Sequence, residues 1–315
     1  MSLFDSRPQH HNFDVAIVGG GPAGLSAAVW LARFLHDVVL FDAGDPRNWQ
    51  TQEIHGVLGH ERIRPAKLRK QGRKQCEHYG VTIIDHHVDR LWSNSPDYFE
   101  MELDEGARFQ ARRVLLTTGI RDNWPDIPGL EQCYGTTVHT CPNCDGYESR
   151  DAATVVLGAG HKAASVALAL TTWTRDIAIC TNGSDPEFDE PTVQTLQRRS
   201  IDVYSHPVEL LEQRRRHLQA IDLEGGPRIE CEHIFIAMGQ RARDDVAAQI
   251  GCRRDDHGFI EIDAHHHTSV DNVFAAGDIT PGAQMAIRAA AGGAEAALSI
   301  HHSLIPDYRR VHREC

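Results

Sequence analysis

The stretch that decides the fold is residues 13–24, which read FDVAIVGGGPAG. Its first part is a short apolar run, rich in β-branched side chains and closed by glycine, which predicts a buried parallel strand. The glycines have the G-x-G-x-x-G spacing of a dinucleotide-binding turn. Gly19 allows the tight turn, Gly21 lets a pyrophosphate approach the backbone, and Gly24 lets a helix pack closely on the strand. The N-terminus of that helix would then face the phosphates.

The residues that follow this turn complete the same fingerprint. Residues 25–35 have a helical pattern, residues 38–41 form a second apolar strand, and that strand ends in Asp42. An acidic residue at this place accepts a hydrogen bond from the ribose of an adenosine. The residues that we expect to hold a dinucleotide here are Gly19, Gly21, Pro22, Ala23, Gly24, Asp42 and Ala43.

The same pattern recurs in the middle of the chain. Residues 153–157 predict a strand, residues 158–163 read GAGHKA and form the turn, residues 164–173 predict a helix, and residues 176–180 predict the next strand. The motif tolerates alanine in place of its third glycine. The candidate contacts for a second dinucleotide are Gly158, Gly160, Lys162 and Asn182.

Two further strands indicate where the chain passes between the two folds. The strand at residues 114–119 runs into a proline-rich stretch, and the strand at residues 233–239 runs into a polar one. We therefore predict an α/β protein with two Rossmann-like dinucleotide-binding domains, the second inserted into the first. The first domain is predicted to be discontinuous, with residues 1–118 and 247–315, and the second to cover residues 119–246.

The composition is that of an ordinary globular protein, with 315 residues of which 41% are hydrophobic and 24% charged. Lysine and arginine number 32 against 44 aspartates and glutamates, a net charge of −12 that argues against broad binding to nucleic acids or anionic membranes. No apolar run approaches the roughly 18–20 residues that cross a bilayer. Residues 1–12 are polar and lack an apolar signal core, so we expect a cytoplasmic protein.

Of the eight cysteines, six are scattered singly and most are expected to be small buried thiols, whereas residues 141–144 read CPNC. Cysteines three apart on the first turn of a helix bring their sulfurs within disulfide reach, and Pro142 suits the first helical position. A helix N-terminus lowers a thiol pKa from about 8.5 towards roughly 3.5–7.5, which favours the thiolate that exchange requires. The alternatives are two unrelated buried thiols, or half of a zinc site, which would need a second such pair. We expect Cys141 and Cys144 to be a redox-active pair, and we expect no metal.

Taken together, these motifs resemble those of the low-molecular-weight thioredoxin reductases and their flavoprotein relatives. The resemblance extends from residue 13 to about residue 302. In that family the Cys-x-x-Cys lies in the inserted domain just before its glycine turn, as it does here. The resemblance also rests on three further motifs: TTG at residues 117–119, CPNCDG at residues 141–146 and VFAAGD at residues 273–278.

The resemblance implies that the first domain binds FAD, with Asp278 bonded to the ribityl chain and a helix N-terminus near residues 284–286 at the flavin pyrimidine edge. It also implies that Cys144 faces the flavin C4a and that Asp145 is the acid–base that protonates the outgoing thiolate. The remaining FAD contacts that it implies are Thr118, Gly119, Gly277, Gln284, Met285 and Ala286. We expect a homodimer that acts on a thioredoxin-like protein or on a small disulfide or dithiol.

One element of the family is missing after the second glycine turn. Thioredoxin reductases that use NADPH have an arginine cluster there that grips the 2′-phosphate, whereas residues 180–185 read CTNGSD. We therefore expect no efficient NADPH linkage, and the second site is left open to a second FAD, NADH or NADPH. The lost cluster resembles a branch with dithiol oxidases and reductases that do not use pyridine nucleotides. The oxidases have histidine after the second cysteine, where this chain has Asp145, which favours a reductase.

Three functions stay open at this point. The main prediction is a thioredoxin reductase-like disulfide oxidoreductase; the others are a dithiol oxidase that passes electrons to oxygen and a flavin-bound redox sensor or binding protein. Residues 62–74 carry seven basic side chains in an acidic protein, so they either dock an acidic electron-transfer protein or form a solvated helix face. The electron donor, the disulfide substrate and the direction of electron flow do not follow from the sequence.

Overall fold

The structure, a computed structural model, describes residues 11–48, 50–95 and 97–309. The chain divides into two compact units. Unit 1 comprises residues 1–47, 66–121 and 241–315, and unit 2 comprises residues 48–65 and 122–240. Residues 48–65 thus belong to unit 2, whereas the sequence analysis placed them in the first dinucleotide-binding domain. The predicted domain bounds themselves stay a prediction. The expectation of a cytoplasmic protein rests on the polar residues 1–12, and most of these lie outside the described residues.

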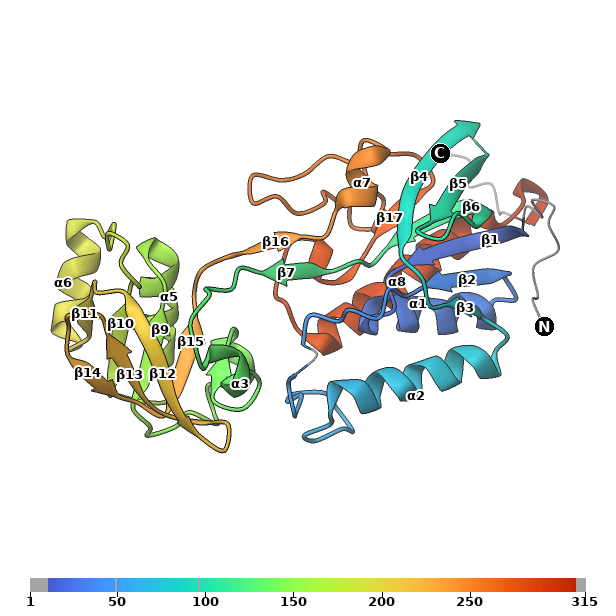
Figure 1. The fold of residues 1–315 in the computed structure, drawn as a ribbon. Coiled ribbons are helices and arrows are strands. Elements are labelled where there is room, and N and C mark those ends of the chain that lie inside the picture. Colours follow the sequence, from blue (N-terminus) through green and yellow to red (C-terminus); the bar gives the residue numbers. More distant parts are fainter. Residues whose placement is uncertain (1–10, 49, 96, 310–315) are drawn as a thin grey trace. The chain divides into compact units, whose positions relative to one another are not determined.

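Unit 1 is built on a seven-stranded sheet with the order β3-β2-β1-β6-β5-β4, and β17 also pairs with β6 (Figure 1). The parallel strands are β1 (His11–Val18), β2 (Val38–Phe41), β3 (Thr82–Ile84), β6 (Arg108–Leu116) and β17 (Val273–Ala275). The strands β4 (Val88–Ser95) and β5 (Tyr98–Leu103) continue from β6 as an antiparallel meander. Val18 pairs with Phe41 on one side and with Leu116 on the other, so the carboxyl ends of three strands meet at the first glycine turn.

The helical elements of unit 1 are α1 (Pro22–Arg33), α2 (Pro65–His78), α7 (Asp245–Gln249), η1 (Gly277–Ile279), α8 (Ala286–Leu304) and η2 (Asp307–Arg309). Along β1, Ala16 and Val18 enter one buried cluster and Val15 and Ile17 enter another, because successive side chains of a strand point to opposite faces. Both faces of the sheet are therefore covered, which explains why the sequence of β1 is apolar without alternation. The helices α1 and α8 together cover one face of this sheet. They pack closely against each other because their contact residues are mainly alanine and glycine.

Unit 2 contains a five-stranded parallel sheet with the order β11-β10-β9-β15-β8. Its strands are β8 (Val138–His139), β9 (Thr154–Leu157), β10 (Ile177–Cys180), β11 (Asp202–Tyr204) and β15 (His233–Ile236). An antiparallel sheet is formed by β12 (Val208–Arg214), β13 (His217–Leu223) and β14 (Arg228–Glu230). The helices are α3 (Leu130–Cys133), α4 (Pro142–Asp145), α5 (Gly160–Leu170) and α6 (Glu190–Arg198). Where the chain passes between the units, β7 (Ile120–Asp122) and β16 (Gln240–Ala242) form a two-stranded sheet.

The strands and helices predicted around both glycine turns are confirmed, with small shifts at their ends. The helix expected at residues 164–173 begins earlier, at Gly160, because the second glycine of the turn already belongs to it. The helix whose N-terminus is expected near residues 284–286 covers Ala286–Leu304, with Met285 as its N-cap. Among the described residues, no helix has the length and apolar character needed to cross a membrane.

Candidate functional site

The first glycine turn lies between β1 and α1, and its shape is fixed by close backbone packing. The N–H of Gly19 donates to the carbonyl of Phe41 at 2.8 Å, which ties the turn to β2. A Cβ added to Gly24 would lie 1.9 Å from the carbonyl oxygen of Gly19, so only glycine fits where the helix meets the turn. A Cβ added to Gly21 would meet no atom within 4 Å. The turn therefore leaves open space at the glycine expected to face a pyrophosphate.

Asp42, at the end of β2, is held by arginines that the sequence analysis did not connect with it. Its side chain is 7% exposed and its Oδ2 accepts hydrogen bonds from Arg69 and, at 2.9 Å, from Arg73, both on α2. Arg73 also pairs with the exposed Asp85. The carboxylate is therefore fixed at the strand end, with Oδ1 directed at the backbone N–H of Gly44 at 3.1 Å.

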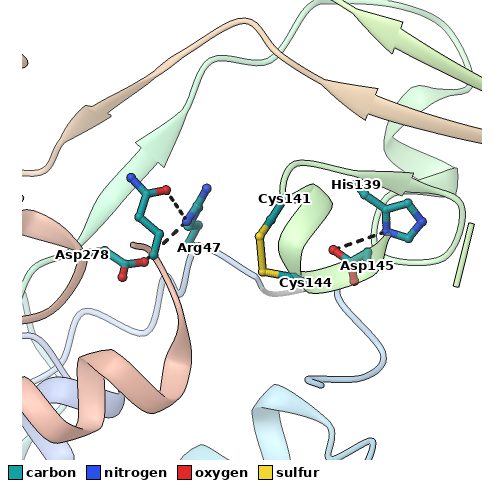
Figure 2. The surroundings of a disulfide bond; sticks show 7 residues. Arg47, His139, Cys141, Cys144, Asp145 and Asp278 are labelled. Atoms are coloured by element: carbon teal, nitrogen blue, oxygen red, sulfur yellow. Dashed lines mark hydrogen bonds and ion pairs between the residues drawn. A yellow bond between two sulfur atoms is a disulfide. The ribbon is translucent and has the colours of Figure 1, made fainter. Parts of the chain in front are cut away.

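The other residues predicted to contact FAD lie at the same edge of the unit 1 sheet. A Cβ added to Gly277 would meet Ala23 at 2.9 Å, which places the start of η1 against the start of α1. Asp278 lies 3.5 Å from Arg47, and Arg47 donates to Gln284 at 3.2 Å, so η1 and the approach to α8 share one guanidinium (Figure 2). Of the predicted contacts at this edge, Ala23 and Gly277 are buried, Thr118, Gly119, Asp278, Gln284 and Ala286 are half-buried, and Pro22, Ala43 and Met285 are exposed.

A buried donor in unit 1 supports the fit to a polar cofactor. The guanidinium of Arg243 binds the backbone carbonyl and the carboxylate of Asp45, and the hydroxyl of Thr118 donates to the carbonyl of Arg243. Within the described part of the chain, the Nε of Arg243 is the buried side-chain atom that has no hydrogen-bond partner. An unsatisfied buried N–H is costly, and a polar group of a bound ligand would satisfy it. Together with the open space at Gly21, this donor fits an FAD held by unit 1.

The second glycine turn is bonded to its neighbouring strand in the same way as the first, but different residues lie over it. The N–H of Gly158 donates to the carbonyl of Cys180 at 2.9 Å, as Gly19 does to Phe41. The N–H of Gly160, however, donates to the carbonyl of Pro186 at 2.9 Å. A carboxylate oxygen of Glu187 lies 3.9 Å from the place of a Cβ on Gly160. Pro186 and Glu187 therefore take up part of the hydrogen-bonding capacity and of the space at this turn.

The two other candidate contacts in unit 2 also have partners within the chain. Asn182 has a left-handed backbone, with φ of 51°, and its side-chain oxygen accepts from the N–H of Val208 at 2.8 Å. Lys162, on the first turn of α5, donates to Gln240. The structure thus gathers Gly158, Gly160 and Lys162 at one turn, and it uses Asn182 to attach the end of β10 to β12.

The redox pair lies in a single helical turn that follows β8. Cys141 and Cys144 form a disulfide with a Cα–Cα distance of 5.3 Å, inside the usual range of about 4.4–6.8 Å. Cys141 is the N-cap of α4 and Pro142 is its first residue, as the sequence predicted. Because α4 has only four residues, its dipole is small. The neighbouring side chains therefore matter more to the chemistry of this pair than the helix does.

Asp145, directly after Cys144, has a strongly perturbed acidity. Burial, with a smaller contribution from the charge of nearby Glu148, raises the pKa of its carboxyl to about 7. Its Oδ2 lies 3.7 Å from Nδ1 of His139, the last residue of β8 (Figure 2). Burial lowers the pKa of His139 to about 3, with smaller contributions from His233 and His55. A carboxyl that holds its proton near neutral pH is suited to general acid–base chemistry.

Five other cysteines of the described chain are buried free thiols, as expected from their scattered positions: Cys76, Cys133, Cys180, Cys231 and Cys252. Burial raises all five thiol pKa values, that of Cys76 to about 11 and that of Cys231 to about 12. Such thiols are poor nucleophiles at neutral pH. Redox chemistry in the described residues is therefore concentrated at the disulfide.

The arginines and the histidine that surround the predicted residues were not predicted from the sequence. Arg47, Arg243 and His139 carry no motif of their own and are recognised only by their contacts. The basic run at residues 62–74 is divided, because Arg69 and Arg73 serve Asp42 while Arg62 pairs with Glu53 at 2.5 Å. Its role in docking a protein stays a prediction. No group of three metal-ligating side chains occurs among the described residues.

Comparison with known proteins agrees with this site. A family model described as pyridine nucleotide-disulphide oxidoreductase matches residues 13–294. A probable thioredoxin reductase of Arthroderma benhamiae is 33% identical over 186 residues, which are 57% of this chain and 46% of that protein. The chain thus spans about half the length of that relative. Thioredoxin reductase tcpT of Claviceps purpurea is 29% identical over 281 residues, 84% of this chain and 86% of that protein.

Two solved structures are similar over nearly the whole chain. The crystal structure of HlmI has a TM-score of 0.89 at 31% identity and covers 95% of each chain. The atypical thioredoxin reductase TRi from Desulfovibrio vulgaris Hildenborough has a TM-score of 0.51 at 31% identity, with 93% of this chain and 99% of that chain covered.

The chain belongs to the pyridine nucleotide-disulphide oxidoreductase family, since the family model covers most of its length. Within that family it is a thioredoxin reductase-like flavoprotein disulfide oxidoreductase that depends on FAD. The predicted fold class, the resemblance to thioredoxin reductases and the FAD cofactor are thereby confirmed.

Proposed function

We propose that this flavoprotein transfers two electrons between FAD, the Cys141–Cys144 pair and an external disulfide or dithiol, and that its electron donor is not NADPH. The observation that carries the proposal is the Cys141–Cys144 disulfide with the carboxyl of Asp145 beside it. When bound, FAD supplies or accepts the electron pair. The residues of the chain perform the exchange between sulfurs and hold the proton that it requires.

The exchange balances if Asp145 provides that proton. A thiolate of the reduced pair attacks the external disulfide, forms a mixed disulfide and releases one external thiolate, which takes the proton from Asp145. The second cysteine then gives its proton to the carboxylate of Asp145, attacks the sulfur of its neighbour and restores the Cys141–Cys144 disulfide. The second external thiolate leaves and takes that proton from Asp145. A carboxyl with a pKa near 7 is protonated often enough to act as the acid and ionised often enough to act as the base in the reverse direction.

The second glycine turn supports a donor other than NADPH. A 2′-phosphate carries close to two negative charges, and charge-assisted contacts that compensate it contribute about 1.5–3 kcal/mol each. Residues 180–185 contain no arginine or lysine, and the chain carries a net charge of −12. The N–H of Gly160, which the motif would offer to a phosphate, already donates to Pro186. Both observations weaken binding of NADPH at this turn.

Asp145 favours a reductase over a dithiol oxidase, because an acid beside the pair protonates a leaving thiolate. A thioredoxin-like protein or a small disulfide is the substrate that this chemistry suits. The oxidase that passes electrons to oxygen and the redox sensor without turnover are the competing functions. They differ from the reductase in what reoxidises the reduced protein.

The test is a single turnover under anaerobic conditions. The flavin is reduced photochemically, oxidised thioredoxin or a small disulfide is added, and the flavin absorbance is followed; a separate sample receives oxygen. We expect rapid reoxidation by the disulfide in the wild type and none in Cys144→Ser, which should retain its FAD. Cys252→Ser, a buried thiol of unit 1, is the matched control and should behave like the wild type. Faster reoxidation by oxygen would indicate the oxidase, and no catalytic reoxidation by either would indicate the sensor.

A further inference from the structure

We propose that His139 and His233 form a proton path that connects Asp145 with solvent at the start of β15, where His233 is partly exposed. The inference rests on the proposed function, because the proton that it carries is the one that Asp145 exchanges with a thiolate. It adds two positioning residues that act through Asp145 and do not touch the sulfurs. Neither histidine belongs to a recognised motif of the sequence.

The sheet of unit 2 brings the two histidines together. β8 and β15 are parallel neighbours, and His139 is in register with Phe235. His233 lies two residues before Phe235 and therefore points to the same face of the sheet. The ring of His139 lies 5.4 Å from that of His233, nearly parallel to it, and 5.1 Å from that of Phe235. Nε2 of His139 lies 3.2 Å from Nδ1 of His233, so the rings are within hydrogen-bond distance.

The local chain brings His139 to Asp145. His139 ends β8 two residues before Cys141, and Asp145 ends the single turn of α4 that follows. The turn reverses the chain, so Oδ2 of Asp145 lies 3.7 Å from Nδ1 of His139. This distance exceeds the upper limit of a catalytic hydrogen bond, about 3.2 Å, by about 0.5 Å, and such contacts commonly tighten in the reacting complex. The order along the path is then Asp145, His139 and His233.

Burial and the neighbouring charges keep both histidines neutral near pH 7 and leave the carboxyl of Asp145 partly protonated there. Asp145 faces Glu148 and His139, and burial with Glu148 raises its pKa to about 7. His139 is 7% exposed and faces Asp145, His233 and His55, and burial with the two other histidines lowers its pKa to about 3. The contact between Asp145 and His139 is therefore not a fixed ion pair. A neutral imidazole with one N–H can pass a proton on without storing a charge.

His233 and His55 mark the two ends of this group. Burial lowers the pKa of His233, with Glu232 acting in the opposite direction and His217 in the same one. His233 is only partly buried, so its outer ring nitrogen is the place where water enters the path. On the other side, Nε2 of His55 lies 3.5 Å from Glu148. His55 is engaged with a carboxylate there, so we assign the path to His233.

The proton transfer balances atom by atom. Asp145 gives its proton to the released thiolate and becomes a carboxylate. It takes a proton from Nδ1 of His139, while Nε2 of His139 takes one from Nδ1 of His233 and the outer nitrogen of His233 takes one from water. Both rings finish neutral in the other tautomer, and exchange with water resets them. In the reverse reaction the same steps carry the proton outward.

The experiment compares His139→Asn and His233→Asn with the wild type and with a control, His206→Asn, in which an exposed histidine of unit 2 is replaced. His233→Asn keeps the test available if His139→Asn does not fold, because His233 is the less buried of the two. Single-turnover reoxidation by a small disulfide is measured between pH 5.5 and 9, in H₂O and D₂O, with and without added imidazole. Ring-nitrogen NMR of the wild type and of Asp145→Asn, in the resting oxidised protein, gives a readout that does not depend on turnover.

We expect both path variants to slow the exchange about tenfold, less than the roughly 10²–10⁴-fold of a lost acid–base, because Asp145 itself is 20% exposed. Their rates should show a larger solvent isotope effect and should recover with imidazole, whereas the control should keep the wild-type profile. Asp145→Asn should shift the ring-nitrogen signals of both histidines. Wild-type rates and isotope effects in both variants, or slowing without rescue, would overturn the path. A wild type that exchanges no electrons with any disulfide would instead refute the proposed function.

Discussion

At the first glycine turn the N–H of Gly19 reaches Phe41, and at the second the N–H of Gly158 reaches Cys180, with distances of 2.8 and 2.9 Å. The backbone thus connects both turns to the neighbouring strand in the same way. Their surroundings differ. The strand beside the first turn ends in Asp42, held by two arginines, and the strand beside the second ends in uncharged residues at 180–184.

The space above the turns differs as well. Gly21 has no atom within 4 Å of an added Cβ, whereas the N–H of Gly160 is taken by Pro186 and the carboxylate of Glu187 lies nearby. A glycine motif therefore makes the turn, and residues from elsewhere in the chain decide whether a dinucleotide can use it. Three experiments test this difference.

The largest effect is expected at the third position of each motif. Gly24→Ala would place a methyl group 1.9 Å from the carbonyl oxygen of Gly19. We therefore expect lost FAD and a Tm lower by roughly 2–12 °C, the result of an overpacking of about 1–3 kcal/mol. Ala163→Gly, the matched change in the second turn, should lower the Tm by about 2–4 °C and keep the FAD. Thermal unfolding and flavin stoichiometry measure both. Equal FAD content in the two variants would contradict the comparison.

A smaller effect is expected at the acid of the first fold. Asp42→Asn removes the carboxylate charge that Arg69 and Arg73 hold in place, and it should weaken the predicted charged hydrogen bond to the ribose. We expect FAD to bind about tenfold more weakly, which corresponds to about 1.4 kcal/mol. Asp85→Asn is the control, because Asp85 also pairs with Arg73 but is exposed. Titration of the apoprotein with FAD gives both affinities, and an unchanged affinity in Asp42→Asn would remove that residue from the site.

The smallest effect is expected for Pro186 and Glu187, which lie over the second glycine turn. In the wild type we expect micromolar NADPH or NADH to bleach the flavin only slowly, as measured by anaerobic mixing. Glu187→Gln should strengthen binding of ADP-ribose about two- to threefold, because removal of one exposed like charge is worth on the order of 0.5 kcal/mol. Glu224→Gln, which removes another exposed carboxylate of unit 2, should leave it unchanged in a calorimetric titration. Rapid, saturable bleaching by NADPH would show that the covered turn is used.

Much of this protein is determined by short segments of its sequence. The glycine spacing in residues 19–24 and 158–163 depends on contacts within one strand, turn and helix, so both turns and their flanking elements were predictable. The same holds for the disulfide, since two cysteines three residues apart on one helical turn have only one way to meet. The FAD cofactor and the family follow from the combination of these motifs. No property of distant residues is needed for any of them.

The tertiary structure alone decided what surrounds those motifs. Arg69 and Arg73 reach Asp42 across 27 and 31 residues, and His233 reaches His139 across 94 residues. Pro186 reaches Gly160 across the helix α5, the strand β10 and a loop. No sequence motif connects any of these residues with its partner, because the partners are far apart along the chain and only the tertiary fold brings them together. A motif in the sequence fixes the backbone of a turn. The charge, the free space and the proton carriers around it depend on which strands become neighbours in the sheet.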